Sequence, residues 1–545
     1  MKASDLFVKQ LEEEGVEYIF GLPGEENLDF LESIRNSKIK LIVTRHEQAA
    51  AFMAATYGRL TGKAGVCFST LGPGATNLVT GVAYAQLIGA PMVSISGQKA
   101  IRNNWQAKFQ QVDVVNLMKP ITKKSIGIVD ANTIPTVIRN SFKTAELERP
   151  GAVHIELPED IASSESNAVI QKKEYTRRPV SERKAIIKAA EMINASKHPL
   201  IIVSSGANRK LVTKALTNLI TTKNMYVVHT QMGKGVISDD SEYSLFATGI
   251  HKRDYVSCGI ERADLIITVG YNISEYPPYV WNKDLSKKII NIDFIESEVD
   301  KYYNPDVEVI GDIGYSLWEI WKLVDKRKKD SVFQKTRESI LEVIDAKDKI
   351  KSEKLLPHEI VQEVRQSLGE EDILTLDNGI YKLWFSRLYK TYKPNTFLLD
   401  NALATMGAGL PSGIVAKMLN PEKNVLTVVG DGGFMMNSQE IETAIRNKIP
   451  IVVLILNDEG YGFIKWKQQN MHFKNFALDL GNPDFVKYAE SYGAVGIRVK
   501  KSDKLSDVIK KAFKMNKVVI IECPIDYSVN YEEFTNKIPN IVCNI

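Results

Sequence analysis

Two aspartates, Asp431 and Asp458, stand where two apolar segments of the chain end. The first segment, residues 425–429, is rich in β-branched side chains and stops at the glycine-rich run 430–433. The second, residues 451–456, stops at an Asn–Asp pair that contains Asp458. Short apolar runs bounded by glycine or Asn–Asp are typical of buried strands followed by tight loops. Both aspartates are therefore predicted to lie directly after a strand.

A helix is expected between these two strands. Asn437 stands three residues before Glu440, which is the spacing of a capping box at a helix start. The apolar residues that follow recur at helical spacing at Ile441, Ala444 and Ile445. A strand, a crossover helix and a second strand form a right-handed parallel unit, so both strand ends lie at the same edge of the sheet. That edge is where open α/β sheets bind ligands.

The residue types at this edge suit a divalent cation and a phosphate group. Carboxylates such as those of Asp431 and Asp458 are ligands for Mg²⁺, which commonly joins one or two carboxylates to substrate phosphates. Gly430, Gly432 and Gly433 expose backbone N–H groups beside a helix N-terminus, where anions bind. An isolated Asp–Gly is more often a turn than a ligand. Two acidic strand ends one parallel unit apart favour a metal-bridged diphosphate over the turn.

Length and composition indicate a globular protein of three domains. The chain has 545 residues, of which 44% are hydrophobic and 25% charged, and it is too long for a single core. The net charge of +4 arises from 70 basic and 66 acidic residues. This near balance implies no nucleic-acid partner. No apolar run approaches the length that spans a membrane, so no membrane partner is expected.

The cysteines and the N-terminus predict a cytoplasmic protein. Cys67, Cys258, Cys523 and Cys543 stand far apart, without the spacing of a metal site or a redox motif. That spacing fits free thiols in a reducing compartment. The chain begins with an amphipathic helix that contains acidic residues, rather than with a targeting segment.

Alternating strand and helix patterns predict an α/β protein with three doubly wound parallel-sheet domains. The first domain is expected to cover residues 1–165, the second 186–325 and the third 357–545. In the first domain, strands are predicted at residues 16–20, 41–44, 65–69, 92–96 and 152–157.

The later domains differ in what they carry. The second has predicted strands at residues 199–203 and 263–269 and lacks a GxGxxG fingerprint. Residues 322–354 are charged, have a helical period and are predicted to connect it to the third domain. In the third domain, a helix and a strand lead to Asp377, much as a helix and a strand lead to residues 21–24 in the first. This weak similarity favours two related domains.

Gly430, Asp431 and Gly432, followed at a spacing of 27 by Asp458 and then by Gly460, resemble the cofactor signature of thiamine diphosphate-dependent enzymes. The resemblance implies that Asp431, Asp458 and the backbone carbonyl of Gly460 bind Mg²⁺, which in turn holds the cofactor diphosphate. It also implies a pyrimidine-binding, a central and a diphosphate-binding domain, in that order.

Glu47 is the candidate for activating that cofactor. Thiamine diphosphate loses its C2 proton to its own aminopyrimidine, provided that a carboxyl group holds the far ring nitrogen. A buried glutamate in a dry site suits this task. Glu47 follows a predicted strand and precedes a helix of small residues, 48–55. The residues alone leave this role and a surface ion pair with Arg45 as equal alternatives. Residues 45–54 resemble the segment that carries the activating glutamate in acetolactate synthases, which implies the first.

The same resemblance implies further site residues. Met406 is expected to support the bent conformation of the cofactor, although its residue type alone suggests core packing. Gln110 and Lys123 match positions near the substrate, with surface polarity as the alternative. Further positions expected at the cofactor are Gly72, Pro73, Asp377, Asn378, Gly379, Gly433 and Tyr461.

Three segments indicate which acetolactate synthases the chain resembles. Enzymes that bind FAD carry a characteristic charged segment in the central domain, and residues 270–282 lack it. Together with residues 486–493 and 526–530, this resembles the FAD-independent catabolic acetolactate synthases. The resemblance implies thiamine diphosphate and Mg²⁺ without FAD. It implies that pyruvate is decarboxylated and that its hydroxyethyl unit joins a second pyruvate to give 2-acetolactate and CO₂. A homodimer or homotetramer with active sites between chains is expected.

Some residues depart from that pattern and leave alternatives open. Glu25 and Glu26 stand where catabolic enzymes usually have a small residue and a lysine, and an unpaired carboxylate there would repel an anionic acceptor. Tyr381 and Lys382 also replace the usual residues. The alternatives are a decarboxylase or carboligase with another 2-oxo acid or acceptor, and a paralogue that binds the cofactor without turnover. The missing fingerprint excludes a Rossmann dehydrogenase.

Overall fold

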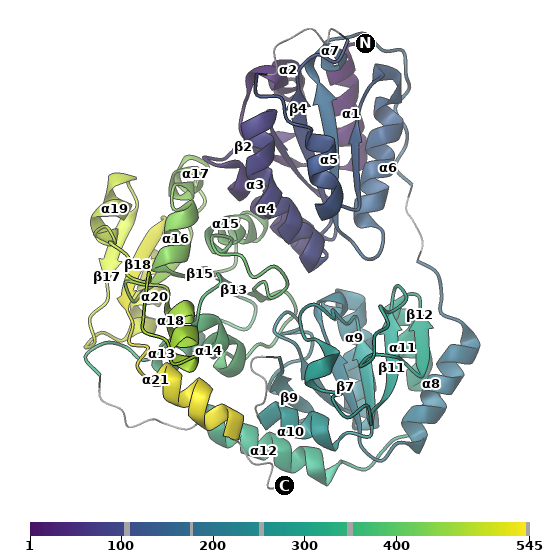
Figure 1. Ribbon diagram of the computed structural model, residues 1–545, viewed down its shortest axis with the longest axis vertical. Helices are drawn as coiled ribbons and strands as arrows, with labels where there is room; N and C mark the ends of the chain where they lie inside the picture. Colours follow the sequence, from purple (N-terminus) through teal and green to yellow (C-terminus); the bar gives the residue numbers. More distant parts are fainter. Residues whose placement is uncertain (103–108, 175–177, 250–254, 346–351, 541–545) are drawn as a thin grey trace.

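Three parallel sheets define the architecture. The computed structural model describes residues 1–102, 109–174, 178–249, 255–345 and 352–540. Within these ranges the chain forms three parallel sheets of six strands, each flanked by helices, which confirms the predicted α/β fold with three parallel-sheet domains. In Figure 1 the N-terminal domain lies at the top, the central domain at the lower right and the C-terminal domain at the left. The exact domain boundaries stay predictions.

The N-terminal domain has the strand order β2-β1-β3-β4-β6-β5. Its strands are β1 (Tyr18–Gly21), β2 (Lys40–Val43), β3 (Gly65–Ser69), β4 (Met92–Gln98), β5 (Lys124–Gly127) and β6 (Ala152–Pro158). Its helices are α1 (Ala3–Glu14), α2 (Leu28–Arg35), α3 (Glu47–Thr61), α4 (Gly72–Ile88), α5 (Val114–Met118), α6 (Ile134–Glu146) and α7 (Glu159–Ala162). The inner strands β3, β4 and β6 are almost entirely buried, because helices cover both faces of a parallel sheet.

The central domain has the strand order β12-β11-β10-β7-β8-β9, which is the order of dinucleotide-binding folds. Its strands are β7 (Pro199–Val203), β8 (Tyr226–His229), β9 (Ser244–Ala247), β10 (Leu265–Val269), β11 (Lys288–Asp293) and β12 (Val307–Ile310). Its helices are α8 (Arg183–Ala195), α9 (Lys210–Lys223), α10 (Tyr255–Arg262) and α11 (Ile313–Leu323). The predicted connecting helix is α12 (Ser331–Asp345), which is shorter than expected within the described residues.

The C-terminal domain has the strand order β14-β13-β15-β16-β18-β17. Its strands are β13 (Ile373–Leu376), β14 (Phe397–Leu398), β15 (Val425–Gly430), β16 (Val452–Asn457), β17 (Val495–Arg498) and β18 (Val519–Pro524). Its helices are α13 (Pro357–Ser367), α14 (Tyr381–Leu388), α15 (Gly409–Leu419), α16 (Asp431–Asn437), α17 (Glu440–Arg446), α18 (Gly462–Asn470), α19 (Phe485–Ser491), α20 (Leu505–Lys514) and α21 (Val529–Tyr531). Numbered from its own first strand, this sheet has the same order as the N-terminal sheet. That agreement supports the similarity predicted between the two domains.

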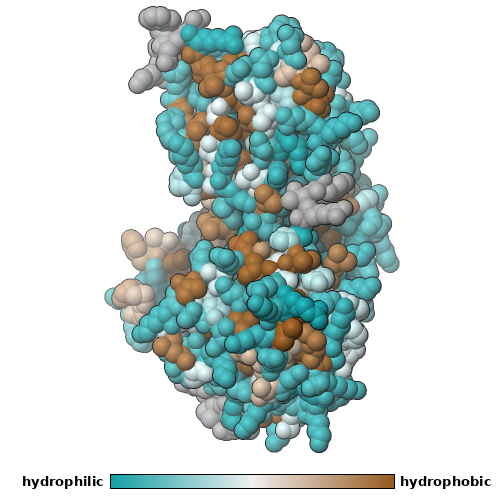
Figure 2. Space-filling model, turned by 90° about the vertical axis from the view of Figure 1, so that its right-hand side faces the viewer, coloured by the Kyte–Doolittle hydropathy of each residue, from teal (hydrophilic) through white to brown (hydrophobic). Residues whose placement is uncertain are grey.

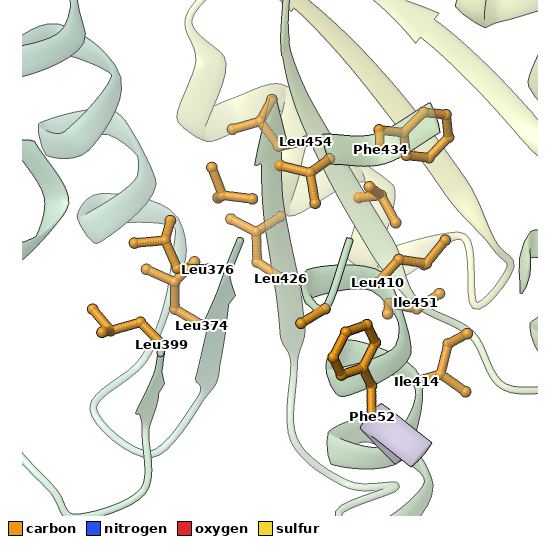
Figure 3. Close-up of a cluster of buried hydrophobic side chains, with 14 of the residues drawn as sticks. Phe52, Leu374, Leu376, Leu399, Leu410, Ile414, Leu426, Phe434, Ile451 and Leu454 are labelled. Atoms are coloured by element: carbon orange, nitrogen blue, oxygen red, sulfur yellow. The ribbon is translucent and has the colours of Figure 1, made fainter. Parts of the chain in front are cut away.

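Helix α3 joins the N-terminal and C-terminal domains through a shared core. Its small residues let neighbouring helices approach closely: a Cβ on Gly81 of α4 would lie 2.3 Å from the Cβ of Ala51. Figure 3 shows Phe52 of α3 beside Leu410 and Ile414 of α15, within one cluster of buried side chains. The hydroxyl of Thr56 in α3 lies 2.9 Å from that of Ser412 in α15. The start of α3 is therefore fixed relative to the C-terminal domain.

The surface alternates between polar and apolar side chains. In Figure 2, hydrophobic residues are scattered among hydrophilic ones on the face formed by the N-terminal domain above and the central domain below. Among the helices in the described ranges, none is long and apolar enough to cross a membrane.

The cysteines differ in part from the prediction of free thiols. Cys67 in β3 and Cys523 in β18 are free and buried, as expected. Cys258 in α10 is disulfide-bonded, so the prediction is wrong for this residue. A strand context predicts burial of a cysteine, but the sequence gives no indication of which thiols approach each other in space. Cys543 lies outside the described residues.

Candidate active site

The two aspartates predicted from the sequence lie at neighbouring strand ends. β15 and β16 are paired so that Gly430 is opposite Leu456. Asp431 is the first residue of α16, and Asp458 directly follows β16. Burial raises the pKa of Asp431. Burial also raises the pKa of Asp458 to about 7, and the negative charge of Asp431 contributes to that rise. A buried carboxylate, that of Asp431, beside the partly buried carboxylate of Asp458 favours a bound cation.

An asparagine that the sequence analysis did not single out holds this pair. The Asn482 side-chain amide donates to Oδ2 of Asp431 at 2.7 Å and to Oδ1 of Asn457 at 3.1 Å. The backbone N–H of Gly460 also donates to the carboxyl group of Asp431. Asn482 therefore orients one carboxylate by joining it to the end of the neighbouring strand.

The donor set fits Mg²⁺ in combination with a diphosphate. No group of three or more His, Cys, Asp or Glu side chains that could hold a metal occurs in the part of the chain that the structure describes. Mg²⁺ does not need such a cage, because it is commonly bound by one or two carboxylates together with phosphate oxygens. Asp431, Asp458 and the carbonyl of Gly460 supply protein oxygens of this type. The roles of these residues as metal ligands stay predictions.

The glycines beside Asp431 leave no room for side chains. A Cβ on Gly432 would lie 3.0 Å from the Tyr461 ring and 3.5 Å from Cε of Met406. A Cβ on Gly433 would lie 2.4 Å from Oδ2 of Asp377. The start of α16 therefore presents bare backbone N–H groups, as a diphosphate site at a helix N-terminus requires. Met406 and Tyr461 lie beside Gly432, and their contact with the cofactor stays a prediction.

Asp377 and Asn378 hold the segment that carries Met406. The Asp377 carboxyl group accepts the backbone N–H groups of Gly407 and Asn378, each at 2.9 Å. Burial raises the pKa of Asp377 to about 6, although these N–H groups oppose the rise. The amide of Asn378 donates to the carbonyl of Thr405 at 2.7 Å. Both side chains contact the segment that carries Met406. Direct contact of Asp377, Asn378 and Gly379 with the diphosphate stays a prediction.

Tyr381 and Lys382 are built into the same region. The Tyr381 hydroxyl accepts the backbone N–H of Gly430 at 2.9 Å, and a Cβ on Gly379 would collide with the Tyr381 ring. The ammonium group of Lys382 donates to Oδ1 of Asn378 at 2.7 Å. Burial lowers the pKa of Lys382 to about 8, while nearby carboxylates, that of Asp400 foremost, oppose the change. Both side chains are buried, so neither departure from the family pattern lies on the surface.

Glu47 is buried at the first position of α3. Its Oε2 atom accepts a hydrogen bond from the Asn77 side chain at 3.0 Å. Among the described ion pairs, none joins Glu47 to the exposed Arg45, which was the alternative. A Cβ on Gly74 would lie 3.3 Å from Oε1 of Glu47. The glycine leaves space beside this oxygen, as a carboxyl group that contacts a ligand requires.

The predicted capping box of Asn437 and Glu440 is wrong. Asn437 is the last residue of α16, and its amide donates to Oε1 of Gln48 at 3.0 Å and to the carbonyl of Gly407 at 2.8 Å. The Glu440 carboxyl group accepts the backbone N–H of Arg45 at 3.0 Å. Hydrogen bonds to Arg45 and Gln48, which flank Glu47, take the place of the predicted capping box.

The remaining predicted residues lie at two different edges of the N-terminal sheet. Gly72 and Pro73 open α4 after β3, at the same carboxyl edge as Glu47, and a Cβ on Gly72 would lie 2.2 Å from the carbonyl oxygen of Gln110. Lys123 directly precedes β5 and therefore lies at the opposite edge. Its ammonium group donates to the carbonyls of Leu147 and Arg149. Lys123 is therefore not near Glu47 within one chain. The residues around Lys123 do not indicate at which edge of the sheet it lies.

The carboxylate of Glu26 is paired. Its two oxygens contact Nζ of Lys99 at 2.7 Å and the hydroxyl of Thr70 at 2.6 Å. Burial opposes ionisation of Glu26, but these hydrogen bonds outweigh it and the pKa is lowered. Glu25 is exposed. The repulsion expected from an unpaired carboxylate therefore does not apply to Glu26.

Comparison with protein families identifies each of the three domains. Residues 1–117 match the thiamine pyrophosphate enzyme N-terminal TPP binding domain, residues 186–320 the central domain and residues 377–523 the C-terminal TPP binding domain. The first and last matches contain Glu47 and the aspartate pair, respectively.

Individual relatives match over nearly the whole chain. An acetolactate synthase of Bacillus subtilis is 34% identical over 99% of this chain and 95% of its own length. A probable acetolactate synthase large subunit of Methanococcus aeolicus is 33% identical over 97% of this chain and 92% of its own. A catabolic acetolactate synthase of Raoultella terrigena is 31% identical over 97% of this chain and 95% of its own. With these matches and three domains of the thiamine pyrophosphate enzymes in order, the chain belongs to the thiamine pyrophosphate-dependent acetolactate synthase family.

Proposed function

We propose that the chain is a Mg²⁺- and thiamine diphosphate-dependent enzyme that converts two molecules of pyruvate into 2-acetolactate and CO₂. The observation that carries the proposal is the pair of carboxylates at neighbouring strand ends beside the glycine-rich start of α16, the buried Asp431 and the partly buried Asp458. The relatives named acetolactate synthase support this reaction. When bound, thiamine diphosphate supplies a carbon nucleophile and accepts the electron pair that decarboxylation leaves behind.

The C-terminal domain holds the charged end of the cofactor in this proposal. Asp431, Asp458 and the Gly460 carbonyl bind Mg²⁺, while the N–H groups at the start of α16 donate to the phosphates. Asn482 keeps the Asp431 carboxylate in position. Met406, whose neighbours in the chain are fixed by the Asp377 and Asn378 side chains, supports the remainder of the cofactor.

Glu47 holds a proton at the aminopyrimidine nitrogen. Asn77 occupies Oε2 of Glu47, and the neighbouring glycine, Gly74, leaves space at Oε1. The Oε1 atom is thus the one that contacts the cofactor ring.

The acceptor is a second 2-oxo acid, for which we propose pyruvate. Glu26, whose residue type argued against an anionic acceptor, is paired with Lys99 and does not contribute an uncompensated charge. This pairing supports an anionic acceptor at the carboxyl edge of the N-terminal sheet. Gln110, whose backbone contacts Gly72 at that edge, is proposed to lie near it. Lys123 lies at the opposite edge, so any role near the substrate requires a second chain.

We propose that two copies of the chain complete each site, in a homodimer or a homotetramer. Large apolar side chains around α16 and the 471–476 segment are exposed, among them Met436 (45%), Phe473 (58%) and Phe476 (79%). Exposed apolar groups next to a ligand site are typical of interaction surfaces. Sedimentation velocity measures the state: a monomer with full activity would contradict shared sites.

Two further proposals concern FAD and cellular location. Residues 270–282 lack the FAD segment, and Tyr271 instead accepts a hydrogen bond from the Trp281 indole at 2.9 Å; activity is therefore expected without added FAD. We also propose a cytoplasmic location, although disulfides are uncommon there and Cys258 is disulfide-bonded. Alkylation of thiols in intact cells followed by mass spectrometry determines the state of Cys258, and fractionation determines the compartment.

Purified protein with pyruvate, Mg²⁺ and thiamine diphosphate, without FAD, tests the function. Pyruvate loss is followed while acetolactate and acetaldehyde are separated, and Asp431→Asn serves as a matched control with the same shape but without the charge. Acetolactate in the wild type and its loss in the control support the proposal. Acetaldehyde alone rejects pyruvate as the acceptor. Unchanged pyruvate rejects it as a substrate and directs the search to other 2-oxo acids.

A further inference from the structure

Tyr527 lies beside the aspartate pair. β18 pairs with β16 so that Pro524, its last residue, is opposite Asn457. Tyr527 follows shortly after, at the same carboxyl edge as Asp458. Both side chains line a groove of about 1010 Å³ together with Gly462 at the start of α18. Tyr527 therefore belongs to the edge that carries the proposed metal site.

The hydroxyl group of Tyr527 is buried, and no residue in the described part of the chain forms a hydrogen bond with it. Burial of a hydroxyl group without a partner is unfavourable, and native structures rarely retain one without a reason. The neighbouring Tyr381 differs, because its hydroxyl group accepts the backbone N–H of Gly430. An unpartnered hydroxyl beside a ligand site indicates a partner that arrives with the ligand.

The surroundings of Tyr527 identify the chemistry of that partner. A Cβ on Gly462 would lie 2.9 Å from Oδ2 of Asp458 and 3.4 Å from the Tyr527 ring. The aspartate and the tyrosine thus flank the same glycine. The negative charges of Asp458 and Asp431 both act on the Tyr527 hydroxyl, and they favour its role as a donor, since they repel an ionised phenol. Lys354 and Lys465 line the groove together with the carboxylates of Glu353, Asp458 and Asp526, so a negatively charged group there needs a cation beside the aspartates.

We propose that the Tyr527 hydroxyl donates a hydrogen bond to an oxygen atom of the magnesium–diphosphate group, carried either by the diphosphate or by a water on the metal. This inference rests on the proposed function, because it needs Mg²⁺ between Asp431 and Asp458. Tyr527 is then a binding residue whose hydroxyl is unfavourable in the cofactor-free protein and favourable in the loaded protein. Removal of this hydroxyl acts in opposite directions on stability and on cofactor binding.

Tyr527→Phe tests this reversal of sign, because it removes only the hydroxyl. In cofactor-free protein treated with a chelator, we expect a Tm equal to or above that of the wild type. In calorimetric titrations with thiamine diphosphate at saturating Mg²⁺, we expect about tenfold weaker binding, which corresponds to about 1.4 kcal/mol. Mn²⁺ titrated alone and followed by electron paramagnetic resonance separates the two acceptors. Weaker binding of the metal alone indicates a water, and weaker binding of the cofactor only indicates a diphosphate oxygen.

Two controls make the outcome decisive. The Tyr303 hydroxyl is bonded to the side chains of Thr268 and Asn291 in the central domain, so Tyr303→Phe is expected to lower the Tm and leave cofactor affinity unchanged. Asp431→Asn is expected to abolish tight binding. Wild-type affinity in Tyr527→Phe, or a lowered Tm like that of Tyr303→Phe, overturns the role of Tyr527. Wild-type affinity in Asp431→Asn overturns the proposed metal site itself, which distinguishes the two failures.

Discussion

Glu440 is predicted to make the stability of the cofactor-free protein depend on pH. This residue opens α17 in the C-terminal domain and is completely buried. Its carboxyl group accepts the backbone N–H of Arg45, two residues before Glu47, and the hydroxyl of Thr443. Burial raises the pKa of Glu440 to about 7, although these hydrogen bonds oppose the rise. The perturbation is Glu440→Gln, which keeps an oxygen acceptor and removes the charge.

The magnitude follows from the difference between the folded and unfolded pKa values. A rise from the ordinary value of 4.5 to about 7 corresponds to about 3 kcal/mol, at about 1.4 kcal/mol per pH unit. Because the folded protein binds this proton more tightly, the contribution to stability is fully present below about pH 4.5. It is lost as the pH rises through about 7. Glu440→Gln has no such loss, so its stability relative to the wild type increases over this interval.

Thermal unfolding at fixed protein concentration, in buffers from pH 4.5 to pH 8 with a chelator present, measures the effect. For a domain of this size, 1 kcal/mol moves Tm by about 2–4 °C. The difference in Tm between Glu440→Gln and the wild type should therefore rise by about 6–12 °C across the series. Glu442→Gln is the matched control on the same helix, because the Glu442 carboxyl group pairs with Arg446, which lowers its pKa.

A difference in Tm that stays constant across the pH series would refute the reasoning about Glu440. The same result for Glu440→Gln and Glu442→Gln would refute it as well, because the two carboxyl groups differ in burial. Glu440→Leu provides a further distinction. It leaves the Arg45 N–H without an acceptor, which costs about 1–3 kcal/mol at every pH.

Three further changes are predicted from the site. Glu47→Gln is expected to keep cofactor affinity within a few-fold by calorimetry while kcat falls by about 10²-fold or more, since proton transfer contributes about that much; near-normal kcat would contradict its role. Asn482→Leu removes the donor to Asp431 and is expected to weaken Mg²⁺ binding about tenfold in activation curves; unchanged activation by Mg²⁺ would count against it. Met406→Ala is expected to weaken thiamine diphosphate binding at saturating Mg²⁺, measured by titration, with little change in Tm because Met406 is only partly buried; a large drop in Tm would indicate core packing instead.

The sequence predicted the parts of the site that depend on local pattern and sheet topology. Asp431 and Asp458 follow strands whose apolar runs are unambiguous, and right-handed parallel connections place such ends together. All the predicted strands form within two residues of their expected ends. Short strands were missed, such as β14 (Phe397–Leu398), because two residues carry no period.

The predictions failed where side chains form hydrogen bonds with residues far away in the chain instead of with their neighbours. Asn437 and Glu440 have the spacing of a capping box, yet their side chains bond to Gln48 and Arg45. α16 begins at Asp431 itself, so Asn437 is already at a helix end. The residues around Asn482 contain no pattern that predicts its hydrogen bond to Asp431. The residues around Lys123 do not indicate at which edge of the sheet it lies. Hydrogen bonds between residues far apart in the chain produce no periodic pattern in the sequence, and such a pattern is what the predictions relied on.

Helix α16 links the aspartate pair to the segment that carries Glu47. The seven-residue helix α16 starts at Asp431 and ends at Asn437, whose amide bonds to Gln48, the residue after Glu47. At about 1.5 Å per residue, the helix spans about 10 Å, too short to bend appreciably. A ligand that fixes Asp431 therefore also fixes the contact beside Glu47. Where two chains complete each site, this helix links the diphosphate-binding residues of a chain to the Glu47 segment of that same chain. A change at Asn437 should accordingly alter both, without touching the cofactor.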